Sequence, residues 1–167
     1  MNLDSLVKGG RLPWRPNARS EGLEVFHRYE IPLTGTFQMD QETVLFTMVF
    51  EGDGELSIWA YVKLDEEVVA GLSGLTFESL ETLDEWVDDQ FLGREAVLAI
   101  VREDRIGSRW TRMHVGSGLL EAADAFLTAV IQSLDRVEDT ASRIRAKMAG
   151  LDAARSELPG GPELLKL

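Results

Sequence analysis

Residues 45–64, LFTMVFEGDGELSIWAYVKL, place two apolar runs on either side of a Gly-Asp-Gly segment. Short apolar runs about a glycine turn are typical of a β-hairpin, in which successive side chains point to opposite faces. Both faces of this hairpin carry large apolar or aromatic residues, so neither is suited to contact with water. The fold must therefore place other elements, or another protein, on each side of these strands.

The turn suggests a register for the hairpin. If residues 52–54 form a three-residue loop, Glu51 lies opposite Glu55, and the other pairs follow by counting. One face then holds the expected core pairs Phe50–Leu56, Met48–Ile58, Phe46–Ala60 and Val44–Val62. The other face holds Leu45, Thr47, Trp59 and Tyr61, which we predict to bind a partner because aromatic side chains with a polar group are enriched at interfaces. The alternative is that the chain's own helices or N-terminal segment cover this face, and a slip of one residue would exchange the two faces.

The remaining segments complete an α+β pattern in the order α-βββ-α-ββ-α. The expected elements are a short helix at 2–8, strands at 23–33, 43–50 and 56–64, strands at 95–101 and 109–115, and a long helix at 117–149; Pro32 is interpreted as lying near the end of the first strand. Between the third and fourth strands we expect a short helical turn capped by Asp65 and a longer helix after Thr76, whose apolar face is Phe77, Leu80, Leu83, Val87 and Phe91. This order predicts an antiparallel sheet with helices packed on it. We expect one domain, residues 1–149, which begins with a short helix and loop over 1–22. The glycine- and proline-containing residues 150–167 are expected to be a disordered tail.

The last predicted helix carries apolar residues in alternating steps of three and four. In its second half this stripe narrows to Leu134, Val137, Ala141, Ile144 and Met148. A sustained 3.5-residue repeat is typical of a coiled-coil seam. At about 1.5 Å per residue the helix is roughly 50 Å long, so we expect its end to project and to pair with a second helix in a homodimer. The alternative is that the helix lies along its own sheet.

The second half of the chain resembles a known family. The segment GLTFESLETLDEWVDDQFLGREAVLAIVREDRIGSRWTRMHVGSGLLEAADAFLTAVI, residues 71–131, combines an acidic amphipathic helix, a Leu92-Gly93-Arg94 break, a hairpin and a Leu-Glu-Ala-Ala-Asp helix. In this order it resembles the second half of a YbjN-type domain, within the type III secretion chaperone-like fold. The resemblance implies a dimeric, non-enzymatic protein that binds other polypeptides.

Catalytic signatures are absent from the sequence. There is no cysteine, which excludes thiol catalysis and thiolate metal sites, and the two histidines, His27 and His114, both fall on predicted strands. Ser117 lies outside any nucleophile-elbow pattern and is better explained as a helix N-cap. Glu85 with Asp88 or Asp89 could bind a hard cation, although a solvated acidic helix face is the commoner arrangement. We therefore predict no enzyme activity, no cofactor and no metal, and an enzyme with an unrecognised site remains the alternative.

The charge distribution bears on the kind of partner. The formal net charge of −12 makes nucleic acid an unlikely ligand and favours a basic protein partner. A local basic patch is nevertheless expected around the second hairpin, formed by Arg94, Arg102, Arg105, Arg109 and Arg112. It could bind an acidic segment or phosphates, or it could pair with the protein's own acidic helix. The alternative function that the charge suggests is an acidic antitoxin or immunity-type inhibitor of a basic nuclease.

The sequence also bears on localisation. No apolar run approaches the roughly 18 residues that a membrane span requires, and the first 20 residues lack the apolar core of a signal peptide. We therefore expect a cytoplasmic protein that binds another polypeptide.

Overall fold

The computed structural model describes residues 21–51, 56–102 and 109–156. The helix expected at 2–8, the turn at 52–54 and the last eleven residues of the expected tail, 157–167, lie outside these ranges. The chain divides into two units, residues 1–126 and residues 127–167, each described by itself below. The division falls inside the last helix, whereas the sequence suggested a single domain that continues to residue 149.

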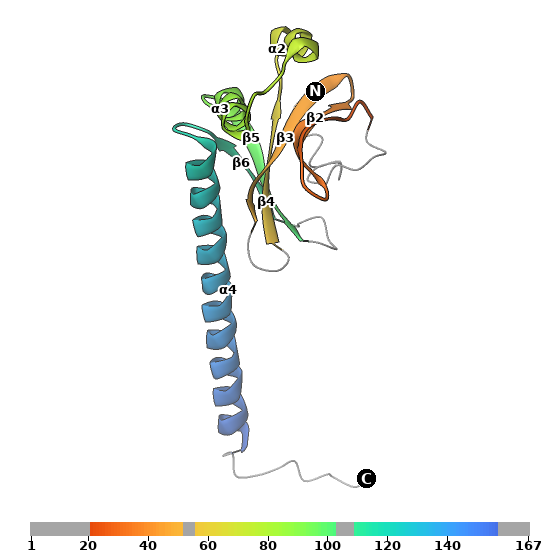
Figure 1. Ribbon diagram of the computed structural model, residues 1–167. Coiled ribbons are helices and arrows are strands. Elements are labelled where there is room, and N and C mark those ends of the chain that lie inside the picture. Colours follow the sequence, from red (N-terminus) through yellow and green to blue (C-terminus); the bar gives the residue numbers. More distant parts are fainter. Residues whose placement is uncertain (1–20, 52–55, 103–108, 157–167) are drawn as a thin grey trace, which may run out of the picture. The chain divides into compact units, whose positions relative to one another are not determined.

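The first unit is built on a six-stranded antiparallel sheet (Figure 1). Its strands are β1 (Glu24–Arg28), β2 (Pro32–Met39), β3 (Glu42–Glu51), β4 (Leu56–Lys63), β5 (Glu95–Arg102) and β6 (Trp110–His114). Each strand pairs with the next in sequence, so the spatial order is β1-β2-β3-β4-β5-β6. The connection from β4 to β5 contains α2 (Glu66–Gly71), η1 (Leu72–Gly74) and α3 (Leu80–Phe91), and α4 (Leu119–Ser156) follows β6. The α+β class, the antiparallel sheet and the C-terminal helix are confirmed.

The expected count of five strands is wrong, because the segment taken as one strand, 23–33, contains the turn between β1 and β2. Pro32 was interpreted as the end of a strand, but it is the first residue of β2, a position where proline is tolerated. The turn between β2 and β3 is also hard to recognise in the sequence, since its two positive φ angles belong to Asp40 and Gln41 and not to glycine. Gly35 is required in β2, because a Cβ there would lie 2.1 Å from the carbonyl oxygen of Glu24 on β1.

The expected register of the opening hairpin is also wrong, by one residue. Phe46 lies opposite Tyr61, and Met48 lies opposite Trp59. The ladder then shifts between Met48 and Phe50, where Val49 is an extra residue in β3. Such a β-bulge changes which side chains share a face. The even-numbered residues of β3 before the bulge therefore share a face with the odd-numbered residues of β4.

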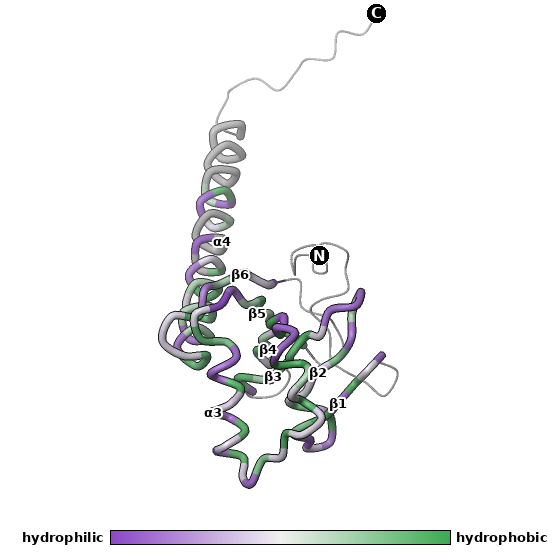
Figure 2. Tube along the Cα trace, turned by 90° about the horizontal axis from the view of Figure 1, so that it is seen from above, coloured by the Kyte–Doolittle hydropathy of each residue, from purple (hydrophilic) through white to green (hydrophobic). Residues whose placement is uncertain are grey.

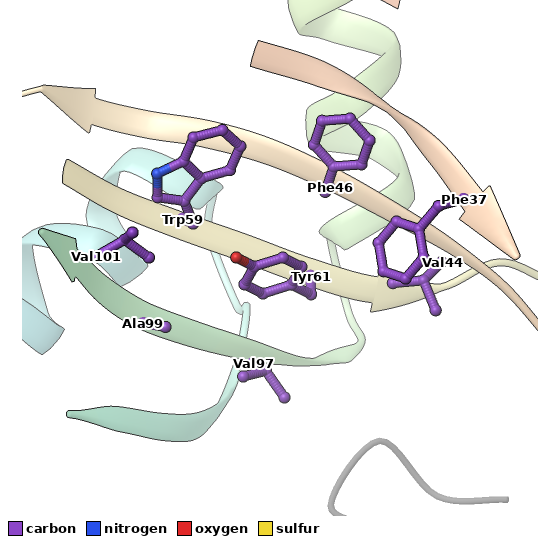
Figure 3. Packing of buried hydrophobic residues seen from close by; sticks show 8 residues of the cluster. All are labelled: Phe37, Val44, Phe46, Trp59, Tyr61, Val97, Ala99 and Val101. Carbon is purple, nitrogen blue, oxygen red and sulfur yellow. The ribbon is translucent and has the colours of Figure 1, made fainter. Parts of the chain in front are cut away.

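One face of the sheet is a buried apolar cluster contributed by four strands (Figure 3). Its members are Phe37, Val44, Phe46, Trp59, Tyr61, Val97, Ala99 and Val101. Three of the aromatic rings follow one another across β2, β3 and β4: the ring centroids of Phe37 and Phe46 are 6.0 Å apart, and those of Phe46 and Trp59 are 6.2 Å apart. Partly buried apolar residues, Leu23, Ile31, Met39, Met48 and Trp110, pack against this cluster. This face is core.

The opposite face of the central strands is buried as well, at Leu45, Ile58, Ala60, Val62 and Leu98. Helical segments pass behind the sheet on this side (Figure 3). Along α3, hydrophilic and hydrophobic residues alternate (Figure 2), and the buried ones are Leu83, Val87 and Phe91. The first two turns of α4 add the buried side chains Leu119, Ala122, Ala123 and Phe126. The central strands are therefore apolar on both faces because the side chains on both faces are buried in the folded chain.

Two helix starts differ from their expected form. Asp65 occupies the N-cap position of α2, but its side chain makes no capping hydrogen bond. Helix α3 begins only at Leu80, with Ser79 and Thr82 forming a capping box, so Leu80 is 55% exposed although it was expected to face the core. Phe77 precedes α3 and packs on Phe26 and Trp86 instead.

The second unit is described over the part of α4 that follows Phe126. The helix continues to Ser156, so residues 150–156, which were expected to belong to a disordered tail, are helical. Among the described residues, no helix has both the length and the apolar composition that crossing a membrane requires.

Candidate functional site

The four residues predicted to face a partner are internal. Leu45, Trp59 and Tyr61 are 0% exposed and Thr47 is 7% exposed. The polar group of Trp59 is satisfied inside the protein, because its Nε1–H donates to Ser57 Oγ at 2.8 Å, and Ser57 Oγ donates to the Val101 carbonyl at 3.2 Å. The prediction of a partner-binding face is therefore wrong, because these four side chains are buried in the folded chain. In the observed register Leu45 and Thr47 lie on the opposite face of the sheet from Trp59 and Tyr61, so the predicted set does not form one surface.

The structure instead shows an open groove where β3 lies beside α3 and the start of α4, with a volume of about 580 Å³. Three segments of the first unit line it: Thr47, Met48 and Val49 from β3, Asp84, Glu85, Val87 and Asp88 from α3, and residues 117–121 at the start of α4. The β-bulge at Val49 lies in its wall. Thr47 is the single member of the predicted partner-binding set that reaches this groove.

Asp88 joins α3 to the beginning of α4. Its Oδ1 accepts a hydrogen bond of 2.7 Å from the backbone N–H of Leu119, the first residue of α4. A carboxylate at this position satisfies one of the unpaired N–H groups of the helix start and interacts favourably with the helix dipole. Gly118 allows the close turn beside it, with a φ of +148° that side chains rarely adopt. Asp88 thus supplies, from another helix, the capping hydrogen bond that was expected from Ser117, while Ser117 Oγ donates a hydrogen bond to Glu121.

The groove combines an apolar surface with negative charge. Apolar side chains come from Met48, Val49, Val87, Leu119 and Leu120, and Leu120 is 74% exposed. Carboxylates come from Asp84, Glu85, Asp88 and Glu121, and the lining contains no Lys, Arg or His. Within the described part of the chain, no ion pair involves Asp84 or Glu85. A groove of this composition is suited to bind a ligand that has an apolar side chain with positive charges beside it.

Several groove residues carried a signal in the sequence, but their proximity did not. Asp88 and Glu85 were noticed as paired carboxylates, Ser117 as a helix start and Leu120 as part of an apolar stripe. What brings them together is that α3 and the first residues of α4 lie beside β3 at one groove, which no local pattern encodes. Met48 and Val49 were missed, since the expected register placed no bulge in β3.

The residues predicted for self-association lie on α4. Leu134 is 45% exposed, Ile144 is 55% exposed and Ala141 is half-buried. Val137 and Met148 belong to the same helix, but their side chains lie outside the described residues. Large apolar side chains therefore meet water along the predicted seam, and self-association stays a prediction.

The predicted basic patch is partly neutralised within the chain. Arg94 forms an ion pair of 2.7 Å with Asp65 and donates to the Lys63 carbonyl, and Arg112 pairs with Glu95. Arg109 is exposed, while the Arg102 side chain and Arg105 lie outside the described residues. The alternative of internal pairing thus holds for Arg94 and Arg112, but their partners are Asp65 and Glu95 and not the acidic helix α3.

No group of three or more His, Asp or Glu side chains within residues 21–51, 56–102 and 109–156 is arranged to hold a metal ion. No protein-family model, curated protein or solved structure matches this chain. The resemblance to YbjN-type proteins therefore stays a resemblance of element order, and function has to be argued from the geometry.

Proposed function

We propose that this protein is a non-enzymatic, dimeric adaptor that binds a short segment of another polypeptide in the groove between β3, α3 and α4. The observation that carries the proposal is the composition of the groove: an apolar surface that includes the exposed Leu120, bordered by Asp84, Glu85 and Glu121 without a described basic partner. Burial of an apolar anchor supplies affinity, and carboxylates around it select positive charge. The preferred segment has one large apolar residue flanked by Lys or Arg.

The size of the groove favours a segment over a whole protein surface. A volume of about 580 Å³ lies within the range of small-ligand and side-chain pockets, roughly 300–1,000 Å³. One or two side chains of an extended or helical segment fill such a volume. The chaperone-like function implied by the YbjN resemblance is consistent with this mode of binding.

A random peptide display library, selected on the full-length protein, tests the proposal directly. Selected peptides should be enriched in Lys or Arg next to a large apolar residue. The double variant Asp84→Lys with Glu85→Lys should weaken binding of a selected peptide about tenfold or more, which corresponds to about 1.4 kcal/mol. Binding should also weaken as salt is raised, because the charges at the groove are exposed.

The matched control is Glu66→Lys with Glu67→Lys on α2. It changes the net charge by the same amount at exposed positions away from the groove. Peptide binding by this control should stay within about twofold of the wild type. If both double variants weaken binding equally, the overall charge and not the groove is responsible, and the proposal is wrong.

The alternative function is inhibition of a basic nuclease by an acidic antitoxin or immunity-type protein, which the net charge of −12 favours. Such an inhibitor binds the folded enzyme over a wide surface. Its affinity should therefore fall with both double variants, and isolated peptides should bind weakly.

A further inference from the structure

The aromatic face of the sheet, which carries Phe46, Trp59 and Tyr61, is buried more completely than one sheet can bury its own side chains. All three rings are fully buried in the single chain. Side chains on one face stand roughly perpendicular to the sheet, so neighbours shield their sides but not their tips. Full burial requires a second layer of apolar groups, about 10 Å above the strands. Part of the chain must therefore lie over this face.

The described elements do not supply that layer. The helical segments pass behind the sheet (Figure 3), and Thr47, on the opposite face from Phe46, lines the groove with α3 and the start of α4. Further along α4, Leu134 and Ile144 are exposed and cover nothing. Among the described residues, the apolar side chains packed against the cluster lie on the strands or next to them and are themselves half-buried: Leu23, Ile31, Met39, Met48 and Trp110.

The composition of the remaining segments points to one of them. Residues 52–55 contain no apolar side chain, and residues 103–108 contain only Ile106. Residues 157–167 follow about 45 Å of helix after Phe126, and eleven residues span at most about 36 Å, so they cannot return to the first unit. Residues 1–20 carry six large apolar side chains, Met1, Leu3, Leu6, Val7, Leu12 and Trp14.

The chain also enters the sheet at a place from which residues 1–20 can cover this face. The backbone N–H of Gln38 donates a hydrogen bond of 2.9 Å to the Glu21 carbonyl, so residue 21 lies beside β2, and Leu23 packs on the cluster. The cluster extends from β2 to β5, which is three strand spacings or about 14 Å. Trp14 precedes Glu21 by seven residues, a length of chain that spans at most about 25 Å. Trp14 can therefore reach every strand of the cluster.

We propose that residues 1–20 bind the aromatic face as an internal ligand, with Leu12 and Trp14 as the apolar anchors. The bound segment closes this face to other proteins and leaves the groove as the surface for a partner. It also brings its four basic residues, Lys8, Arg11, Arg15 and Arg19, to the face opposite the acidic groove. The two faces of the first unit then differ in charge, which orients the unit toward a basic partner.

Photo-cross-linking tests the placement in the full chain, with p-benzoylphenylalanine in place of Trp14. Light attaches this residue to a C–H group that it contacts, and mass spectrometry of the digested protein identifies the position. Attachment should occur within one chain, to side chains of the aromatic face such as Met39 or Tyr61. The same photoreactive residue in place of Glu67, an exposed position on α2, is the control and should not attach to this face.

Three results of the cross-linking would overturn the inference. Attachment to α3 or to residues 117–121 would place Trp14 in the groove. Attachment to a second chain would mean that another copy supplies the cover. Absence of attachment would mean that Trp14 lies in solvent.

Replacement of the two anchors gives a second measurement. Leu12→Asp with Trp14→Asp in the full chain should lower the melting temperature by about 5 °C or more, because it uncovers a packed apolar cluster. It should also increase binding of the apolar dye 8-anilinonaphthalene-1-sulfonate, which reports exposed apolar surface. The matched control, Asn17→Asp with Ser20→Asp, adds the same charge to the same segment and should stay within about 2 °C of the wild type.

Equal falls in melting temperature for the two double variants would assign the effect to charge and overturn the inference. Circular dichroism shows whether the anchor variant keeps its strands and helices. If it does not fold, the cross-linking result decides, because that experiment leaves Leu12 and the rest of the chain unchanged. The peptide-binding test of the groove is independent of all these outcomes.

Discussion

The sheet around Trp59 and the second half of α4 both carry large apolar side chains, but these are buried in the sheet and exposed on the helix. Trp59, Tyr61 and Phe46 are fully buried, and the one polar atom of Trp59 is hydrogen-bonded to Ser57. On α4, Leu134 and Ile144 remain about half exposed. An apolar residue in a sequence therefore favours burial, but the spacing of the residues around it indicates the kind of contact. Apolar residues on adjacent strands pack in a core, whereas a 3.5-residue repeat along a helix is typical of a coiled-coil seam. The apolar side chains of the central strands are buried in the core, while Leu134 and Ile144 of the helix stay exposed in the single chain.

The largest expected effect tests this contrast directly. Trp59→Ala should lower the free energy of unfolding of the sheet unit by about 3–5 kcal/mol, because it removes a large side chain from a packed cluster and leaves a cavity. Leu134→Ala should change that free energy by less than about 0.5 kcal/mol and should instead weaken self-association. Urea denaturation followed by circular dichroism, with hydrogen exchange on β4 amides, measures the first effect. A loss below about 1 kcal/mol for Trp59→Ala would show that its face is not core.

A smaller effect is expected from the hydrogen bond inside that cluster. Ser57→Ala removes the acceptor of the Trp59 indole N–H, and an unsatisfied buried donor costs about 1–3 kcal/mol. Trp59→Phe removes the donor instead, so Ser57→Ala should cost less in the Trp59→Phe background than in the wild type. Urea denaturation of the wild type, Ser57→Ala, Trp59→Phe and the double variant measures the four free energies of unfolding. If Ser57→Ala lowers the free energy of unfolding equally in both backgrounds, the hydrogen bond does not stabilise the fold.

The smallest effect concerns the end of the β3–β4 ladder and depends on pH. The hydrogen bond from Lys63, at 2.7 Å from Glu42 Oε2, holds the pKa of Glu42 below its usual value of 4.5. A lowered folded-state pKa adds stability above pH 4.5, and that stability is lost as the pH falls through the lower, folded-state value. Glu42→Gln should therefore reduce stability by roughly 0.2–1 kcal/mol near neutral pH, since the pair is partly exposed, and by less in acid.

Thermal melts of Glu42→Gln and wild type at several pH values between 3 and 7 measure this difference. Lys63→Met is the matched control, because it removes the same ion pair from the other side. A difference between wild type and Glu42→Gln that grows as the pH falls below 4.5 would contradict the direction of the pKa shift.

The parts of the fold that sequence reasoning predicted well are those with local signals. Gly93 closes α3, the steps of three and four mark α4, and β3, β4, β5 and β6 lie within about two residues of their expected positions. The parts it missed depend on contacts between distant residues. The bulge at Val49 cannot be inferred from a turn, and the start of β2 at Pro32 is visible only once β1 pairs with it.

The candidate site was predictable to a lesser degree. An acidic face on α3 and an apolar residue at position 120 were both visible in the sequence. Their meeting at one groove depends on the hydrogen bond from the Leu119 N–H to Asp88, which joins residues 31 positions apart. The prediction of an interface at Trp59 was wrong for a related reason. The sequence does not show whether the indole N–H of a tryptophan has a hydrogen-bond acceptor inside the protein. Here the fold of the strand places Ser57 Oγ within hydrogen-bonding distance of the Trp59 N–H.

The order of the sheet has a consequence for aggregation. The outermost strands of the described sheet, β1 and β6, are only five residues long, whereas the strands between them have eight or ten. Strand β1 pairs irregularly and has the charged residues Glu24 and Arg28 at its ends, and β6 carries Arg112 and His114. Short, charged or irregular outer strands are poor templates for adding a foreign strand. Arg112 of β6 thus has a role that requires no ligand, because a charged side chain on an outer strand helps to keep an apolar sheet from adding further strands and growing into a fibril.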